Sequence, residues 1–251
     1  MIDVDNLHKA YGDAPVLRGA SFAVDRGEVA ALVGANGTGK TTTLQILAGL
    51  VPPDAGQARI DGVNVSTNRR AAQRRLAFLP QDTRFHGTLS PRQVLRFYAG
   101  LRDNAAPPIA SLLKDVALTD VADDPCTVLS GGMRQRLGLA VVWLSDAPVL
   151  LLDEPGRSLD PDWRAYLKRE LRRRADEGAA VLMATHLHDL WADLIDIHLV
   201  CEAGIIHRDP TGPSAPNSPD DRSIRSSAGD ASANGRAETT EDLGDRRSGP
   251  P

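Results

Sequence analysis

Cysteine is scarce in this sequence: Cys126 and Cys201 are the only two, and neither belongs to a CxxC pair or a Cys/His cluster. Disulfide-stapled domains and structural zinc sites need several such side chains at close spacing. We therefore expect neither framework. A reducing, cytosolic setting fits this cysteine content.

Long hydrophobic runs and an excess of positive charge are also missing. The most apolar stretch, residues 137–152, is interrupted by Ser145, Asp146 and Pro148, whereas a membrane-spanning helix needs about 18 or more apolar residues. The first residues, MIDVDNLHKAYG, contain no apolar signal region. The net charge is −4 at pH 7, so no general basic field favours nucleic acid. We expect a chain that neither spans a membrane alone nor binds nucleic acid.

Large apolar residues become rare beyond residue 208, where only Ile224 and Leu243 remain among Pro, Ser, Gly, Asp and Arg. Such a segment cannot bury enough surface to offset the entropy of the chain. We therefore predict a folded region over residues 1–208 and a disordered polar tail over 209–251. A regulatory or partner-binding role for the tail stays open.

Short apolar runs alternate with helical patterns in the folded region, which is typical of an α/β fold. The strongest candidate for a strand buried on both faces is the continuously apolar run Val149–Leu152. The other predicted strands are Ile2–Leu7, Ala20–Val24, Val29–Val33, Ala58–Ile60, Leu76–Leu79, Ala180–Ala184, Ile197–Cys201 and Ile205–His207. Predicted helices include Thr42–Leu50, Pro91–Leu101 and Gly132–Leu144, the second beginning after an N-cap at Ser90.

The distribution of these elements predicts a core made of about 1–85 and 146–208, interrupted by a helical section over about 86–145. Two arginine clusters, at residues 69–75 and 172–174, are interpreted as solvated helix faces.

A glycine-rich loop follows the apolar run Val29–Val33 and precedes a helical stretch, with the sequence GANGTGKTT over residues 34–42. It matches the pattern G-x-x-x-x-G-K-[ST], whose glycines let backbone N–H groups surround phosphate oxygens. The N-terminus of the following helix adds partial positive charge. The predicted nucleotide-binding residues of the loop are Gly34, Asn36, Gly37, Gly39, Lys40, Thr41 and Thr42. Lys40 would reach the β- and γ-phosphates and Thr41 would ligate Mg²⁺.

An acidic pair, Asp153 and Glu154, directly follows the apolar run Val149–Leu152. A carboxylate at this edge of a sheet is placed to hold Mg²⁺ directly or through water. The neighbouring carboxylate is placed to orient or deprotonate the attacking water. We therefore predict Asp153 as a metal ligand and Glu154 as the catalytic base.

The segment Leu129–Met133, which reads LSGGM, lies between these two motifs. Here the sequence resembles the ABC ATPase family, whose LSGGQ signature stands at this place. The resemblance covers residues 1 to about 208. It implies a P-loop NTPase with a RecA-like core, an N-terminal antiparallel β subdomain and a helical subdomain specific to the family. It also implies that Ser130, Gly131 and Gly132 bind a γ-phosphate held by a second copy.

The resemblance assigns further roles by position. Gln81 corresponds to a glutamine that touches Mg²⁺ or water, His186 to a histidine that contacts the γ-phosphate, and Tyr11 to an aromatic residue stacked on adenine. Residues 158–160 correspond to a loop that crosses to the opposite subunit. Two departures stand out: Met133 replaces the usual glutamine of the signature, and Gly-Arg-Ser at 156–158 replaces the commoner Thr-Asn-Gly. In the latter, Arg157 bears on communication across the dimer interface.

The implied activity is hydrolysis of ATP with Mg²⁺ by a dimer that drives a separate transmembrane permease from the cytoplasmic face of the membrane. The segment from Gln81 to Leu101 is the predicted contact with that permease. Residues 84–101 and 130–140 look like those of ABC-2-type exporters of the drug, copper-enzyme maturation or haem kind. The direction of transport, the cargo, and the choice between homodimer and heterodimer stay open. The alternative is a soluble ABC ATPase, such as one that acts in iron–sulfur cluster assembly.

Overall fold

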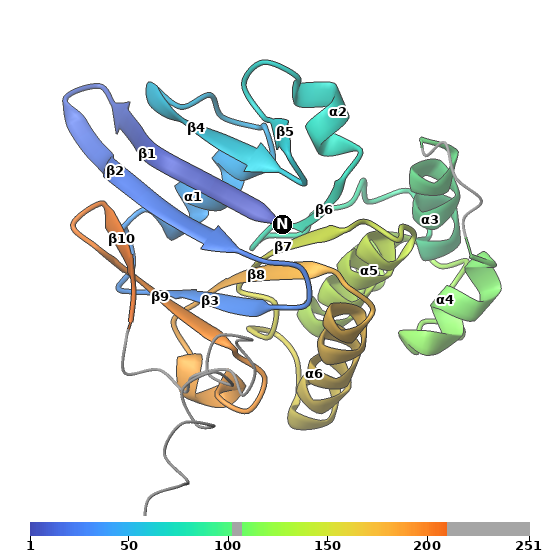
Figure 1. The fold of residues 1–251 in the computed structure, drawn as a ribbon. Helices are drawn as coiled ribbons and strands as arrows, with labels where there is room; N and C mark the ends of the chain where they lie inside the picture. Colours follow the sequence, from blue (N-terminus) through green and yellow to red (C-terminus); the bar gives the residue numbers. More distant parts are fainter. Residues whose placement is uncertain (102–106, 210–251) are drawn as a thin grey trace, which may run out of the picture. The chain divides into compact units, whose positions relative to one another are not determined.

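A six-stranded, mostly parallel sheet forms the centre of the computed structural model, which describes residues 1–101 and 107–209 (Figure 1). Its strands, in spatial order, are β10 (Ile205–Arg208), β9 (Ile197–Glu202), β3 (Val29–Val33), β8 (Ala180–Thr185), β7 (Val149–Asp153) and β6 (Leu76–Leu79). Only the β9–β10 pair is antiparallel. Every residue of β7 and β8 is buried, because helices and a second sheet cover the two faces.

A four-stranded antiparallel sheet covers one face of the central sheet. It comprises β2 (Ala14–Val24), β1 (Ile2–Tyr11), β4 (Ala55–Ile60) and β5 (Val63–Asn64) in that order. Helix α1 (Lys40–Leu47) lies between the two sheets, with Leu44 and Leu47 in the same apolar cluster as Ile2 and Leu182. The predicted N-terminal antiparallel subdomain is therefore confirmed.

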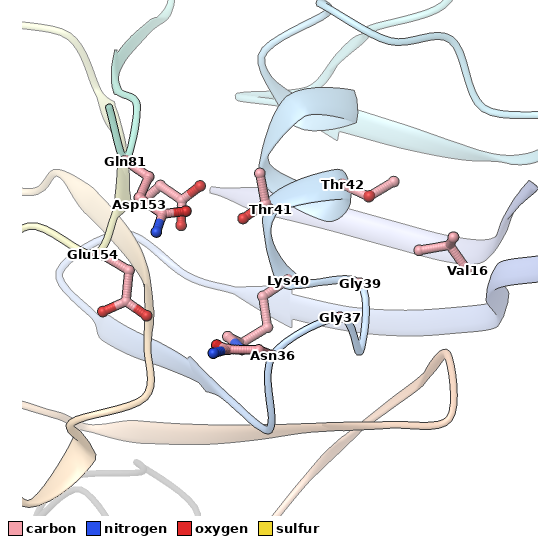
Figure 2. Close-up of a pocket in the computed structure, with 10 residues that line it drawn as sticks. All are labelled: Val16, Asn36, Gly37, Gly39, Lys40, Thr41, Thr42, Gln81, Asp153 and Glu154. Carbon is pink, nitrogen blue, oxygen red and sulfur yellow. The ribbon is translucent and has the colours of Figure 1, made fainter. Parts of the chain in front are cut away.

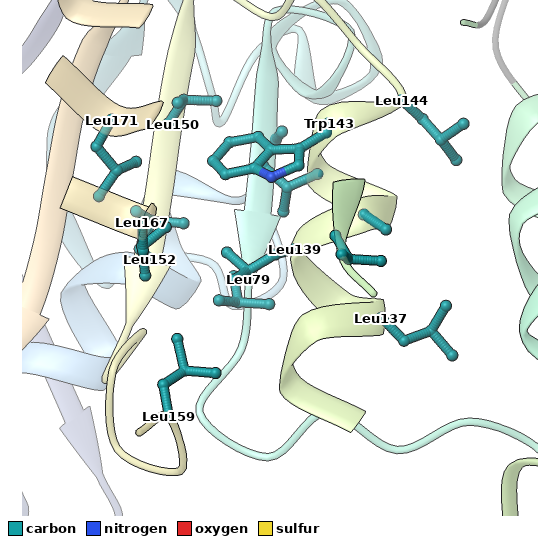
Figure 3. Close-up of a cluster of buried hydrophobic side chains, with 14 of the residues drawn as sticks. Leu79, Leu137, Leu139, Trp143, Leu144, Leu150, Leu152, Leu159, Leu167 and Leu171 are labelled. Atoms are coloured by element: carbon teal, nitrogen blue, oxygen red, sulfur yellow. The ribbon is translucent and has the colours of Figure 1, made fainter. Parts of the chain in front are cut away.

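The opposite face of the central sheet is covered by α5 (Gly131–Trp143) and α6 (Pro161–Asp176). Figure 3 shows leucines of both helices, with Trp143, packed against Leu150 and Leu152 of β7. Asp160 caps α6 by accepting a hydrogen bond from the N–H of Trp163 at 2.9 Å. The remaining helical elements are α2 (Arg69–Gln73), α3 (Pro91–Gly100), α4 (Ile109–Asp115), η1 (Cys126–Val128) and η2 (His188–Trp191).

All the predicted strands occur, and most extend one or more residues beyond the predicted bounds. The helix predicted to follow Ser90 is also present, and a reciprocal pair of hydrogen bonds between Ser90 and Gln93 caps its first turn. The helix predicted over Thr42–Leu50 instead begins at Lys40 and ends at Leu47. Strand β5 and helix α4 were not predicted, because two and seven residues are too few to show a period.

Every regular element in the described parts of 86–145 is a helix, as the sequence predicts. The proposed division of the core around that section stays a prediction, since the described residues all fall in one compact unit. Apart from Asp209, the predicted tail lies outside the described residues.

The interpretation of Arg172–Arg174 as a solvated face is wrong for two of its three residues. Arg172 donates hydrogen bonds to Asp196 and to the carbonyl of Gly27. Arg174 is largely buried, bonded to Glu170 and stacked over the Trp143 ring.

Candidate nucleotide-hydrolysis site

A pocket of about 420 Å³ opens between the start of α1 and the carboxyl ends of β6 and β7 (Figure 2). Nine of its ten lining residues were predicted as site residues from the sequence. The lining comprises Val16, Asn36, Gly37, Gly39, Lys40, Thr41, Thr42, Gln81, Asp153 and Glu154. Figure 2 shows Gln81, Asp153 and Glu154 facing Lys40 and Thr41 across the pocket. The parallel sheet explains this meeting, because strand ends and the following loops gather at one edge.

The glycine-rich loop is held tightly against β9. Gly34 has a φ of 151°, and a Cβ there would lie 2.4 Å from the carbonyl oxygen of Cys201. Only glycine fits this close approach of two backbones. The Cys201 thiol also donates a hydrogen bond to the carbonyl of Thr38 at 3.1 Å. The loop is therefore shaped by tertiary contacts as well as by its own sequence.

Lys40 lies under the loop with its ammonium group close to two backbone carbonyls. Its Nζ donates to the oxygens of Gly34 and Ala35 at 2.7 and 2.8 Å. The side chain is buried, so these bonds compensate the cost of removing the charge from water. They place a positive charge at the concave side of the loop, where phosphate oxygens would lie.

Asp153 and Thr41 supply two oxygen ligands of the kind that Mg²⁺ prefers. Burial raises the pKa of the Asp153 carboxyl above its ordinary value, and a hydrogen bond with Thr41 opposes that shift. In the described residues no group of three or more His, Cys, Asp or Glu side chains is placed to hold a metal. Magnesium at nucleotide sites needs no such cage, since phosphates and water supply the other ligands. The pair therefore fits Mg²⁺.

Glu154 is held in a constrained geometry directly after β7. Its φ of 50° lies in the left-handed region, which is uncommon for a residue other than glycine and occurs often at functional sites. Its N–H donates to the carbonyl of Ala184 at 2.9 Å. Its Oε1 lies 2.7 Å from Nδ1 of His186 and accepts the His186 N–H at 3.1 Å. The structure thus joins two of the three residues predicted as catalytic, Glu154 and His186, while the third, Gln81, lines the pocket with Glu154.

The signature residues are not part of this pocket. Ser130 caps α5 by accepting the N–H of Met133 at 3.2 Å, and its own N–H points to the Met133 thioether at 3.5 Å. The methionine therefore preserves the cap despite the departure from glutamine. Gly131 and Gly132 lie beside Ser158 of the loop after β7.

Gly34, His186 and Tyr11 are also predicted site residues that do not line the pocket. Tyr11 ends β1, is half exposed, and lies with its ring centroid 5.6 Å from the Lys9 ammonium. Its predicted stacking on adenine stays a prediction.

Two residues near the site were missed by the sequence. Val16 on β2 lines the pocket, and no local pattern marks it. Gln135 is buried on α5 and donates to the carbonyl of Glu154 at 3.0 Å. A signal for Gln135 did exist, because it lies one turn after Gly131 and so shares its helix face.

The fold and the phosphate loop define a nucleoside triphosphatase of the P-loop class. A family model described as ABC transporter matches residues 17–157. The chain belongs to the ABC transporter family and contains its ATPase domain. None of the helices in the described ranges is both long enough and apolar enough to cross a bilayer.

Similar proteins include a Nod factor export ATP-binding protein of Burkholderia orbicola, which is 39% identical over 207 residues, or 81% of this chain and 68% of that protein. A linearmycin resistance ATP-binding protein of Bacillus subtilis is 30% identical over 190 residues, or 74% of this chain and 61% of that protein. These relatives support an exporter ATPase over the iron–sulfur assembly alternative.

Solved structures agree with the fold. The ATP-binding subunit of an ABC transporter superposes with a TM-score of 0.77 at 26% identity, covering 83% of this chain and 89% of that one. The dimeric structure of a bacterial ABC transporter cassette gives a TM-score of 0.75 at 21% identity, over 83% of this chain and 97% of that one.

Proposed function

We propose that this chain is the ATP-hydrolysing subunit of an ABC exporter and acts with a separate transmembrane permease. The observation that carries the proposal is the meeting of Lys40, Asp153 and Glu154 around one pocket, with His186 bonded to Glu154. This set provides a phosphate-binding cation, a metal ligand and a base within reach of a single triphosphate. The exporter relatives support the direction of transport.

Each residue of the pocket has a distinct proposed role. The Lys40 ammonium, now bonded to two loop carbonyls, would turn to the β- and γ-phosphate oxygens. Glu154 would accept the proton of the attacking water, with His186 holding its carboxylate in place and facing the γ-phosphate. Gln81 would orient the same water. Bound Mg²⁺ would neutralise charge developing on the phosphates, held by Thr41 and Asp153.

We propose that a second copy completes the site. Ser130, Gly131 and Gly132 begin α5 outside the chain's own pocket, and the N–H groups of the two glycines in the first turn would bind a γ-phosphate held by another copy. In a homodimer with two ATP molecules between the copies, each ATP would contact the pocket of one copy and the signature residues of the other. ATP would then stabilise the dimer, because it contacts both copies at once.

The proposed contact with the permease lies in the segment Gln81–Leu101. Helix α3 presents Phe97, Tyr98 and Leu101 to solvent, and large exposed apolar groups are typical of protein contacts. A permease bound there would place the chain at the cytoplasmic face of the membrane.

Replacement of the base tests the proposed function. We expect wild-type protein to hydrolyse ATP only with Mg²⁺, and Glu154→Gln to reduce kcat by at least about 100-fold while retaining ATP binding. The variant should accumulate as an ATP-bound dimer in size-exclusion chromatography. Glu202→Gln, at an exposed glutamate, is the matched control and should keep full activity. A Glu154→Gln protein with the wild-type rate would disprove the role of the base.

A further inference from the structure

The turn between β7 and α6, residues 154–160, is held by few bonds of its own. Within it, the N–H of Arg157 donates to the carbonyl of Glu154 at 3.2 Å, and the N–H of Leu159 to that of Gly156 at 3.3 Å. The first distance is at the upper end of the usual range for backbone hydrogen bonds, and the second is just beyond it. The position of Glu154, which begins this turn in a strained conformation, therefore depends on contacts from other elements.

One side chain spans the turn from the α5 side. The Gln135 Nε2 group donates to the carbonyl of Glu154 at 3.0 Å, and its Oε1 accepts the N–H of Ser158 at 2.9 Å. Both ends of the amide are used, so only one orientation satisfies the two bonds. The side chain is buried, at 8% exposure, so loss of either bond would leave polar groups without water.

Another residue of the turn, Gly156, lies close against the Trp191 ring. A Cβ at Gly156 would lie 2.5 Å from Cζ2 of the buried Trp191 ring. On the α5 side, a Cβ at Gly132 would lie 2.9 Å from the carbonyl oxygen of Ser158. The turn is thus in close contact with both α5 and Trp191 and has little room to move.

We infer that Gln135 is a positioning residue for hydrolysis, which sets the place of Glu154 and ties it to the signature end of α5. The inference rests on the proposed role of Glu154 as the base. The carbonyl of Glu154 is fixed by Gln135, its N–H by Ala184 and its carboxylate by His186. A displacement of the start of α5 would therefore reach Glu154 through the Gln135 amide. The part of the chain that would bind a second copy's ATP is in this way coupled to its own base.

Two substitutions separate the bonds of Gln135. Gln135→Met keeps the length of the side chain and removes both hydrogen bonds. Gln135→Glu keeps an acceptor for the Ser158 N–H and removes the donor to Glu154. We expect either variant of the full chain to lower kcat for MgATP by about 10- to 100-fold, the effect of misplacing a catalytic group. The KM for MgATP should stay within about twofold, because neither phosphate nor adenine contacts are changed.

Gln73→Met is the matched control, since Gln73 also donates from a partly buried amide to a backbone carbonyl, that of Ala48, at 3.0 Å. It should leave kcat unchanged. Thermal unfolding identifies a variant that fails to fold. If Gln135→Met fails to fold, the kcat of Gln135→Glu tests the inference. A folded variant with wild-type kcat, or one that raises KM alone, would overturn the inference.

The same assays separate this inference from the proposed function. A Glu154→Gln protein with wild-type activity would disprove the role of Glu154 as the base, whatever the Gln135 variants show. An inactive Glu154→Gln protein together with fully active Gln135 variants would disprove only the positioning role of Gln135.

Discussion

Gly156 shows how one missing side chain decides the packing of the turn after β7. The turn approaches the Trp191 ring so closely that even a methyl group at this position would overlap the indole. The sequence marked residues 156–158 only as a departure from the commoner Thr-Asn-Gly. The structure supplies the reason at position 156, because the large ring of Trp191 occupies the space that a side chain there would need.

We expect Gly156→Ala to lower the free energy of unfolding by about 1–3 kcal/mol, the cost of overpacking a filled site. In a Trp191→Phe background the same change should cost clearly less, since phenylalanine lacks the Cζ2 atom. Urea unfolding of the four proteins in this cycle measures the coupling. Gly100→Ala, where nothing lies within 4 Å, should be nearly neutral. Equal costs in both backgrounds would contradict the explanation.

Helix α6 shows how an element that reads as charged surface takes part in the core. Glu170 accepts hydrogen bonds from both Arg173 and Arg174, and Arg174 stacks over Trp143 with its guanidinium carbon 4.2 Å from the ring centroid. Burial by itself would raise the pKa of Glu170, but these two hydrogen bonds outweigh it and hold the pKa below its ordinary value of 4.5.

A carboxyl group with a lowered pKa in the folded state stabilises the protein above its unfolded pKa and loses this effect as the pH falls through the folded value. Glu170→Gln should therefore lower the free energy of unfolding by about 1.5 kcal/mol at pH 7. The difference from wild type should shrink as the pH falls below 4.5. Denaturant unfolding across pH 3–7 measures it.

Glu177→Gln is the control for α6, because Glu177 also pairs with Arg173 but is mostly exposed. Exposed ion pairs contribute little, so this variant should differ from wild type by less than about 1 kcal/mol. A pH-independent loss in Glu170→Gln would assign its effect to packing instead of charge.

At the scale of the whole molecule, several large apolar side chains lie exposed at the end of α3, in the helical section. Phe97 is 59% exposed and packs edge-on against Tyr98, with the ring centroids 5.4 Å apart. No element in the described part of the chain covers the exposed face of Phe97. A membrane partner that covers it would give these side chains the burial that they lack here.

We expect Phe97→Ser to reduce the fraction of the chain that sediments with the membranes of cells containing its permease, while ATPase activity in solution stays unchanged. Leu50→Ser is the matched control, since Leu50 is 58% exposed and lies outside the proposed contact. Equal sedimentation of both variants would contradict the proposed permease surface.

Much of the fold and nine of the ten pocket residues could be predicted because their signals are local. The phosphate loop needs glycines, Lys40 and Thr41 within nine residues. Asp153 is the last residue of β7, and Glu154 directly follows that strand. Strand runs and helix caps likewise depend on neighbours a few positions away. The sequence by itself thus determined the family and the α/β class, and it predicted most of the residues that line the pocket.

Only the tertiary structure decided which distant residues meet. The strand order that puts β3 between β8 and β9 brings Cys201 against Gly34, and β7 beside β8 brings His186 to Glu154 across 32 positions. Gln135 reaches Glu154 across 19 positions because α5 packs on the same sheet. Contacts of this kind depend on the packing of several elements at once, and no single stretch of sequence encodes them.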